Sequence, residues 1–128
     1  MDILLDAHIF LWYANGDKKL KQNYKKLIED QSNKVYLSVA SIWECVIKFQ
    51  IGKLQFPKDP SEYIPEQRKK HQIDSLNITE STIHSLETLP LIHKDPFDRI
   101  IISQSLDKNL KLITEDKLIL NYKFPIFL

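Results

Sequence analysis

Short apolar runs alternate along this chain with longer segments whose apolar residues recur at helical spacing. The runs at residues 3–5, 35–37, 73–78, 110–114 and 124–128 predict strands. Helical spacing, with capping and breaking residues, predicts helices over residues 7–13, 18–30, 38–52, 61–71, 79–90 and 96–109, and a short helical turn after residue 116. Strands separated by helices indicate βα units, which place a parallel sheet between helices. The pattern therefore predicts an α/β domain.

Capping residues and prolines fix several of these boundaries. Pro96 is expected at the first position of a helix, because its missing N–H would be unpaired there in any case. That places Asp95 at the N-cap and Asp98 at the third helical position, an arrangement like a capping box. Ser61 is expected to cap another helix, and Pro125 indicates that the last strand lies at an exposed edge. Asp98 thus has a local structural explanation before any chemical one.

The composition is that of an ordinary globular protein, with 43% hydrophobic and 27% charged residues. At 128 residues, the chain is expected to form a single domain, residues 1–128. Basic residues are concentrated at residues 18–34 and 68–70, a distribution typical of solvated helix faces. Because the net charge is only +1, the protein is not a general polyanion binder, and any nucleic-acid role depends on a local site.

Cysteine content and hydropathy predict the compartment. The single cysteine, Cys45, excludes an internal disulfide and is typical of a reducing cytoplasm. The N-terminus lacks a basic segment, and its apolar run is broken by Asp6 and His8. No uncharged stretch approaches the roughly 20 residues that a membrane span needs. We therefore expect a soluble, cytoplasmic protein with no membrane contact.

Four acidic residues are expected at one edge of the predicted sheet, where the carboxyl ends of parallel strands form binding sites. Asp6 ends the first strand, and Glu44 lies in the second turn of the helix after the second strand. Asp98 lies in the first turn of the 96–109 helix, and Asp116 follows the 110–114 strand. Each acid also has a local explanation, as a helix cap, as a first-turn acid, or, for Glu44, as an i, i+4 partner of Lys48.

Together, the four acids have a consequence that separate caps would not have. Two carboxylates within ~4 Å repel by roughly 4 kcal/mol at an effective dielectric constant near 20. A cluster raises its own pKa values unless a cation lies among the carboxylates. Oxygen ligands select Mg²⁺ or Mn²⁺, and the scattered histidines show no zinc spacing. Mg²⁺ held by acids characteristically serves phosphoryl chemistry, by activating water and neutralising charge in the transition state.

The four acids lie in segments that resemble the motifs of the PIN-domain ribonucleases and, within that family, of the VapC-type toxins of toxin–antitoxin pairs. In chain order, the segments are ILLDAH at residues 3–8, SIWE at 41–44, HKDPFDR at 93–99 and LITED at 112–116. The resemblance spans nearly the whole chain and follows the family's order. Four motifs in series are a specific signal, whereas one alone would be weak.

The resemblance implies a PIN-like three-layer α/β/α sandwich with a five-stranded parallel sheet in the order 3-2-1-4-5. It implies an endoribonuclease that depends on Mg²⁺ or Mn²⁺ and hydrolyses RNA phosphodiester bonds with metal-activated water, leaving 5′-phosphate and 3′-hydroxyl ends. It further implies two protein partners, a small antitoxin and a second copy of the chain in a homodimer.

The same resemblance assigns roles to individual residues. Asp6 and Asp98 carry over as the principal metal ligands, and Glu44 as an acid that binds metal or orients the attacking water. Asp116 carries over as a fourth, more peripheral acid. The remaining candidates are Thr114 and His8, which would orient the ligands, and Arg99 and Lys48, which would contact RNA phosphates. For His8, a packing role is an equal alternative.

Two features of the motifs limit what the resemblance implies. Ala7 stands where many relatives carry Thr or Ser, so a side-chain hydrogen bond near the first acid is not expected from this position. His93 and Asp95 recur in one branch of the family, and we interpret Asp95 as a helix cap and not as a metal ligand. Metal binding through carboxylates does not depend on either point.

Two other functions fit parts of the pattern. A receiver- or phosphatase-type phosphoryl-transfer domain also ends its first strand in Asp, but such phosphatases need a second Asp where this chain has His8. A non-catalytic PIN-like module that binds RNA or protein would keep the fold, but decayed sites usually lose an acid. A groove lined by Trp12, Tyr13 and the helix of Trp43 is a candidate for an antitoxin helix, although such aromatics are more often core.

Overall fold

The computed structural model describes residues 1–124 and 126–128. Its elements, in chain order, are β1 (Asp2–Leu5), α1 (Ala7–Asn15), α2 (Gln22–Glu29), β2 (Lys34–Ser38), α3 (Val39–Gln50), α4 (Pro60–Lys70), β3 (Asp74–Leu76), α5 (Glu80–Thr88), α6 (Pro96–Lys108), β4 (Lys111–Ile113) and α7 (Lys117–Leu120). The strands form a parallel sheet in the order β3-β2-β1-β4. Helices connect each strand to the next, as the predicted βα units require.

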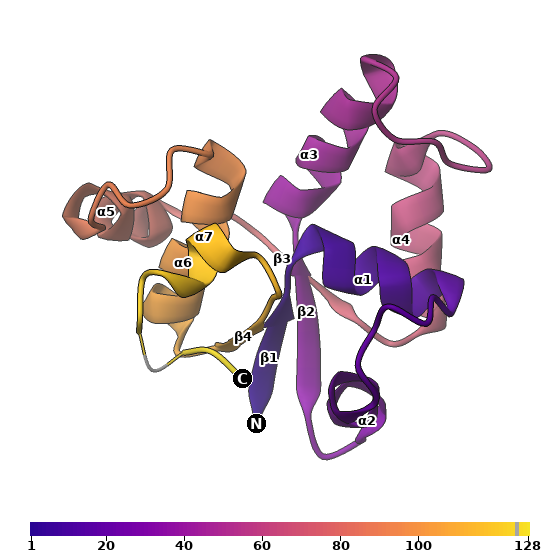
Figure 1. Ribbon diagram of the computed structural model, residues 1–128, viewed down its shortest axis with the longest axis horizontal. Coiled ribbons are helices and arrows are strands. Elements are labelled where there is room, and N and C mark those ends of the chain that lie inside the picture. Colours follow the sequence, from indigo (N-terminus) through magenta and orange to yellow (C-terminus); the bar gives the residue numbers. More distant parts are fainter. Residues whose placement is uncertain (125) are drawn as a thin grey trace.

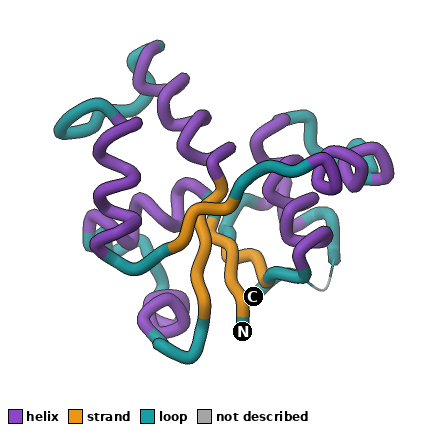
Figure 2. The backbone as a smooth tube through the Cα atoms, turned by 180° about the vertical axis from the view of Figure 1, so that it is seen from behind, coloured by secondary structure: helices purple, strands orange, loops and turns teal. Residues whose placement is uncertain are grey.

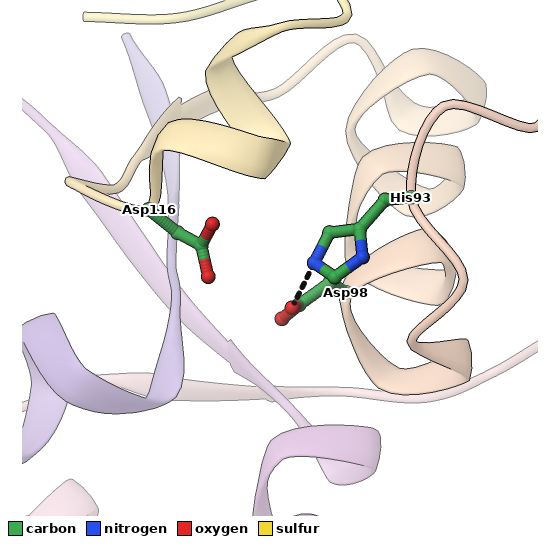
Figure 3. Close-up of side chains that lie close together, drawn as sticks. All are labelled: His93, Asp98 and Asp116. Atoms are coloured by element: carbon green, nitrogen blue, oxygen red, sulfur yellow. Dashed lines mark ion pairs between the residues drawn. The ribbon is translucent and has the colours of Figure 1, made fainter.

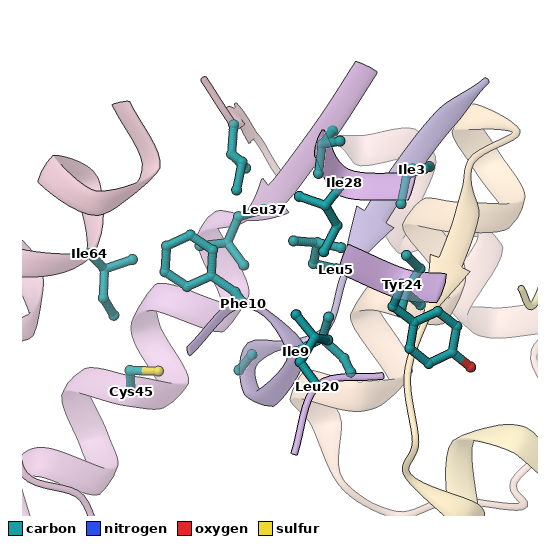
Figure 4. Packing of buried hydrophobic residues seen from close by; sticks show 14 residues of the cluster. Ile3, Leu5, Ile9, Phe10, Leu20, Tyr24, Ile28, Leu37, Cys45 and Ile64 are labelled. Carbon is teal, nitrogen blue, oxygen red and sulfur yellow. The ribbon is translucent and has the colours of Figure 1, made fainter. Parts of the chain in front are cut away.

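Helices cover both faces of the sheet (Figures 1 and 2). Because successive side chains of a strand point to opposite faces, β1 contributes to two cores. Ile3 and Leu5 pack with residues of α1–α4, Phe10 among them, in the cluster shown in Figure 4. Leu4 packs with α6 and α7 on the other face, against Ile102 and Ile119. The predicted α/β/α layering is confirmed.

The described residues contain four strands, so the predicted five-stranded sheet in the order 3-2-1-4-5 is wrong in its last member. On the side of β4 away from β1, the described residues pair in a single parallel bridge, between Leu112 and Phe127. The Leu112 N–H donates to the Ile126 carbonyl at 2.7 Å, and the Leu128 N–H donates to the Leu112 carbonyl at 3.2 Å. Because β4 is only three residues long, it offers a neighbour few ladder positions. The prediction for Pro125 lies outside the described residues.

The start of α6 agrees with the sequence prediction in part. Asp95 is its N-cap and accepts hydrogen bonds from the N–H groups of Phe97 at 2.8 Å and Asp98 at 3.3 Å. The predicted capping box is not completed, because the Asp95 N–H donates to Nδ1 of His93 and not to the Asp98 carboxylate. The Asp98 side chain is therefore left to point elsewhere.

Two other helix starts differ from the prediction. α4 begins at Pro60, so Ser61 lies inside the helix and is not its cap, because Pro60 takes the first position for which its fixed φ is suited. α2 begins at Gln22, later than predicted, because Asp17 caps a preceding turn by accepting from the Lys19 N–H at 2.9 Å. These shifts change neither the layers nor the edge of the sheet at which the acids lie.

Cys45 lies in the core of one layer, on α3, as a free thiol. Burial raises the pKa of Cys45 to about 12, so the thiol stays protonated at neutral pH. Within the described residues, no helix combines the length and the apolar character needed to cross a membrane.

Candidate metal centre

The ends of β1 and β4 hold the first two acids of the site. Asp6 follows β1 and caps α1, because its Oδ1 accepts from the Ile9 N–H at 2.8 Å. Its Oδ2 accepts a short hydrogen bond from the hydroxyl of Thr114, which follows β4. The same Thr114 oxygen accepts from the Asp116 N–H at 3.0 Å. One buried hydroxyl thus connects two site acids across neighbouring strands, which is the contact expected of a residue that orients ligands.

α3 supplies the third acid. Ser38 ends β2 and caps α3 by accepting from the Ala40 N–H at 3.1 Å, which aims the helix away from the carboxyl edge of the sheet. In its second turn, Glu44 is 8% exposed, and its Oε2 lies 3.0 Å from Nζ of Lys48. Burial lowers the pKa of Lys48, but the ion pair with Glu44 outweighs burial and raises that pKa overall. Lys48 therefore keeps its positive charge beside the acids.

Asp98, the fourth acid, faces a buried histidine. Nδ1 of His93 accepts from the Asp95 N–H at 3.2 Å, so the proton of the neutral imidazole is on Nε2. Nε2 lies 2.7 Å from Oδ2 of Asp98, a close contact between the imidazole and the carboxyl group. Figure 3 shows this contact, with the Asp116 carboxylate facing it from the start of α7.

Two overlapping sets of side chains have the spacing of metal ligands. Among the described residues, ligand atoms of Glu44, Asp95 and Asp98 lie within 4.8 Å of one another, as do those of His93, Asp98 and Asp116. Asp98 belongs to both sets and is therefore the centre of the cluster. Asp6 is in neither set, because its oxygens face Ile9 and Thr114, but it lines the same cavity.

The cavity that joins these residues has a volume of about 160 Å³. Its lining residues are Asp6, Ala7, His8, Glu44, Lys48, His93, Asp95, Asp98 and Asp116. All four acids selected from the sequence line it, together with His8 and Lys48. His8 is exposed at the rim, where its ring centroid lies 6.3 Å from that of Trp12. Ala7 has no hydroxyl group to offer Asp6, and the side-chain hydrogen bond to Asp6 comes from Thr114.

Arg99 is engaged away from the cavity. Its guanidinium donates to the Pro90 carbonyl at 2.9 Å, to the Leu89 carbonyl at 3.3 Å and to the Tyr122 hydroxyl at 3.0 Å. Consecutive helical residues point about 100° apart, so Arg99 cannot share the direction of Asp98. Arg99 therefore holds the loop that carries His93, whereas Lys48 lines the cavity; contact of either residue with RNA phosphates stays a prediction.

Crowding shifts the protonation of the acids. The pKa of Asp98 is raised to about 7, first by burial and then by the charges of Asp95, Glu44 and Asp116, against the opposing effect of His93. Burial also raises the pKa of Asp6, although its hydrogen bonds oppose the rise. A divalent cation among these oxygens removes the repulsion, and carboxylate oxygens suit Mg²⁺ or Mn²⁺. The residues present therefore fit such an ion.

Sequence reasoning left two members of the cluster aside. The sequence pattern predicts a capping role for Asp95 and no site role for His93, which is one of four scattered histidines. Both belong to the segment that carries Asp98, and the available signal was their spacing around Pro96. His93 is held beside the first turn by two hydrogen bonds, from its N–H to the Tyr122 hydroxyl and from the Asp95 N–H to its Nδ1.

Replacing Thr114 by valine is expected to weaken Mn²⁺ binding by about 10- to 100-fold, the usual effect of removing a residue that orients metal ligands. Valine keeps the shape of the side chain but removes both hydrogen bonds, to Asp6 and from Asp116. Isothermal titration calorimetry with Mn²⁺ measures the affinity. Thr114→Ser, which keeps the hydroxyl, should restore most of it. Equal affinity of the valine and serine variants would contradict the orienting role.

The structure is thus an α/β domain with a cluster of acids that could hold a divalent cation at one edge of its sheet. Comparison with known families matches residues 3–125 to the PIN domain, and the chain belongs to this family. Ribonuclease VapC16 of Mycobacterium tuberculosis is 30% identical to the chain over 54 residues. That segment is 42% of this chain and 38% of VapC16, so the chain matches less than half the length of that relative.

Solved structures share the fold over nearly the whole chain. VapBC2 from Rickettsia felis, bound to a DNA fragment from its promoter, matches with a TM-score of 0.70 at 13% identity, covering 100% of this chain and 96% of that one. A toxin–antitoxin complex from Klebsiella pneumoniae matches with a TM-score of 0.66 at 17% identity, covering 98% and 95%. At such identities, the similarity shows the fold alone, and it confirms the PIN fold predicted from the motifs.

Proposed function

We propose that this protein is an endoribonuclease that depends on Mg²⁺ or Mn²⁺, and that it is the toxin of a toxin–antitoxin pair. One observation carries the proposal: the carboxylates of Asp6, Glu44, Asp98 and Asp116 line one small cavity at the carboxyl edge of the sheet. Membership of the PIN family and the similarity to Ribonuclease VapC16 support the nuclease class.

The metal would be held around Asp98. Asp116 lies within ligand spacing of Asp98 in one set, and Glu44 and Asp95 do so in the other, while the imidazole of His93 contacts the Asp98 carboxyl group. Bound in such a site, a divalent cation activates water and neutralises charge on the phosphodiester oxygens. The sharing of Asp98 between the two ligand sets makes it the residue on which binding depends most.

The remaining residues position the acids and the substrate. Thr114 holds Asp6 and the backbone of Asp116, so these acids keep their orientation without the metal. Glu44 orients the attacking water or accepts its proton, and Lys48 beside it offers a positive charge to a phosphate oxygen. Water attack at phosphorus in this arrangement leaves 5′-phosphate and 3′-hydroxyl ends, as the resemblance implies.

The proposal includes protein partners. Structures similar to this chain include VapBC2 and a toxin–antitoxin complex, which supports a small antitoxin as the cognate partner. We also propose that residues 1–128 act as a single PIN domain and that two copies form a homodimer. Light scattering of the purified chain, alone and with the product of the adjacent reading frame, measures both associations.

Purified protein is expected to cleave total cellular RNA when Mg²⁺ or Mn²⁺ is present and to lose that activity completely in EDTA. The physical reason is that most of the side chains lining the cavity are acids, which repel a phosphodiester unless a divalent cation lies among them. Gel electrophoresis of the RNA follows cleavage, and excess Mn²⁺ should restore it after EDTA. Metal binding without cleavage, or the absence of both metal binding and cleavage, would favour the non-catalytic module instead.

A further inference from the structure

Three cavities follow one another from the acid cluster to the far end of α1. The metal cavity shares Asp6, His8 and Asp116 with a second cavity of about 260 Å³. That second cavity shares Trp12 with a third one of about 410 Å³, which lies between α1 and α2. In Figure 1, these two helices lie on the same side of the sheet, with α2 below α1. Because neighbouring cavities share lining residues, the three adjoin one another, and we refer to them together as the depression.

The charge of this depression changes sign along its length. The metal end is lined by acids, whereas the third cavity is lined by Lys18, Lys21 and Lys25 with Asp17 as its one acid. In the part of the chain that the structure describes, neither Lys18 nor Lys25 forms an ion pair, and both are exposed. Because the net charge of the chain is only +1, these unpaired lysines attract an anion to this site, whereas the protein as a whole does not attract anions strongly.

An aromatic side chain lies between the two ends. Trp12 lines both the second and the third cavity, and its ring packs only partly against the core. Half-buried aromatic rings beside lysines are the usual means of holding single-stranded nucleic acid, because every base has a face that can stack. A duplex cannot use such a ring, since its bases are already stacked on one another.

An ion pair lies where the second and third cavities meet. Nζ of Lys21 is 3.3 Å from Oε1 of Glu115, and both side chains are partly or largely exposed. The Lys21 side chain is largely exposed and its ammonium has three donors, so it can contact a phosphate while it stays paired with Glu115, whose Oε1 is buried. The junction therefore does not close the depression to a polyanion.

From these observations we infer that the depression is the binding track for single-stranded RNA on one side of the scissile phosphate. The lysines between α1 and α2 contact backbone phosphates, and Trp12 stacks with a base between them and the metal centre. The inference rests on the proposed function, because only that function makes the metal centre the place at which the bound RNA is cleaved. An acidic peptide is the other class of ligand that the lysines would attract, but the binding of such a peptide does not require that the metal cavity lie next to them.

Adjacent lysines provide a matched pair of variants. Lys18 and Lys25 line the third cavity, whereas their exposed neighbours Lys19 and Lys26 do not. Lys18→Gln/Lys25→Gln and Lys19→Gln/Lys26→Gln make the same change in net charge. The first pair should weaken binding of a fluorescein-labelled 12-nucleotide RNA about ten-fold at low salt and reduce the slope of log affinity against log salt by about 1.4, as expected for two lost phosphate contacts. The second pair should leave both nearly unchanged.

Fluorescence anisotropy in EDTA measures this binding without cleavage, and a duplex of the same sequence should bind more weakly. Trp43→Phe leaves Trp12 as the chain's one tryptophan, so its emission should be quenched by the single strand. Equal affinities of the two double variants, or an unchanged Trp12 emission, would overturn the inference and assign the groove to another ligand, such as an acidic peptide. Binding through the track without Mg²⁺-dependent cleavage would instead reject the proposed function and leave the track standing.

Discussion

Asp98→Asn is expected to lower metal-dependent RNA cleavage by about 10²- to 10³-fold. Asp98 is the one residue common to both sets of ligand atoms, and asparagine keeps its shape while removing the charge that holds a cation. A bound divalent ion supplies several kcal/mol of transition-state stabilisation, and each 1.36 kcal/mol corresponds to about a factor of ten in rate. Initial rates on total cellular RNA with saturating Mn²⁺ measure the loss.

The same substitution is expected to stabilise the metal-free protein. The Asp98 carboxylate is crowded by other acids, and its pKa of about 7 means that its charged form is disfavoured in the fold. Asparagine removes this repulsion, and after allowance for partial exposure the gain is on the order of 1 kcal/mol at pH 8, or a few degrees in Tm. A residue needed only for folding would give the opposite sign.

Asp107→Asn provides the control on the same helix. Asp107 accepts a hydrogen bond from Ser81 at 2.7 Å and lies near Lys108, and these contacts lower its pKa. Its substitution should leave cleavage unchanged and should not raise Tm. Undiminished cleavage by Asp98→Asn, or a lower Tm than that of the unsubstituted protein, would remove Asp98 from the centre of the site.

Local sequence signals predicted the backbone positions of the acids well. Asp6, Asp95 and Asp116 each cap a helix, as their residue types before apolar periodic segments indicate. Their convergence was predictable as well, because short apolar runs joined by helices require a parallel sheet, whose strand ends meet at one edge. Capping and metal binding therefore do not compete: the caps fix the backbone from which the carboxylates project.

The sequence did not predict the direction of individual side chains or the number of residues that pair with β4 at the end of the chain. Asp98 and Arg99 are adjacent in one motif, yet one faces the acids and the other donates to the carbonyl of Pro90. No local pattern shows that His93 accepts from the Asp95 N–H, since that bond depends on the path of the loop. The apolar run at residues 124–128 has strand character, but whether it pairs depends on the length of its neighbour, which is three residues.

The stability of the metal-free protein is expected to fall as the pH rises from about 4 to about 7. The folded protein keeps the proton of Asp98 up to about pH 7, whereas the unfolded chain releases it near the ordinary pKa of 3.8. Since the folded state binds more protons in this window, raising the pH favours unfolding. The raised pKa of Asp6 acts in the same direction. Thermal unfolding in EDTA across this range measures the decline.

Mn²⁺ should reverse that decline, and the reversal should itself depend on pH. At pH 8 the carboxylates are ionised and repel one another, so a cation present at about 100 times its Kd adds about 2.7 kcal/mol, or roughly 10 °C in Tm for a chain of this size. At pH 5 the proton on Asp98 competes with the metal, and the shift in Tm should nearly vanish. Asp98→Asn should lose most of the Mn²⁺ effect at pH 8. An equal Mn²⁺ shift at both pH values would show that the metal binds elsewhere, because ligands outside this crowded cluster would already be ionised at pH 5.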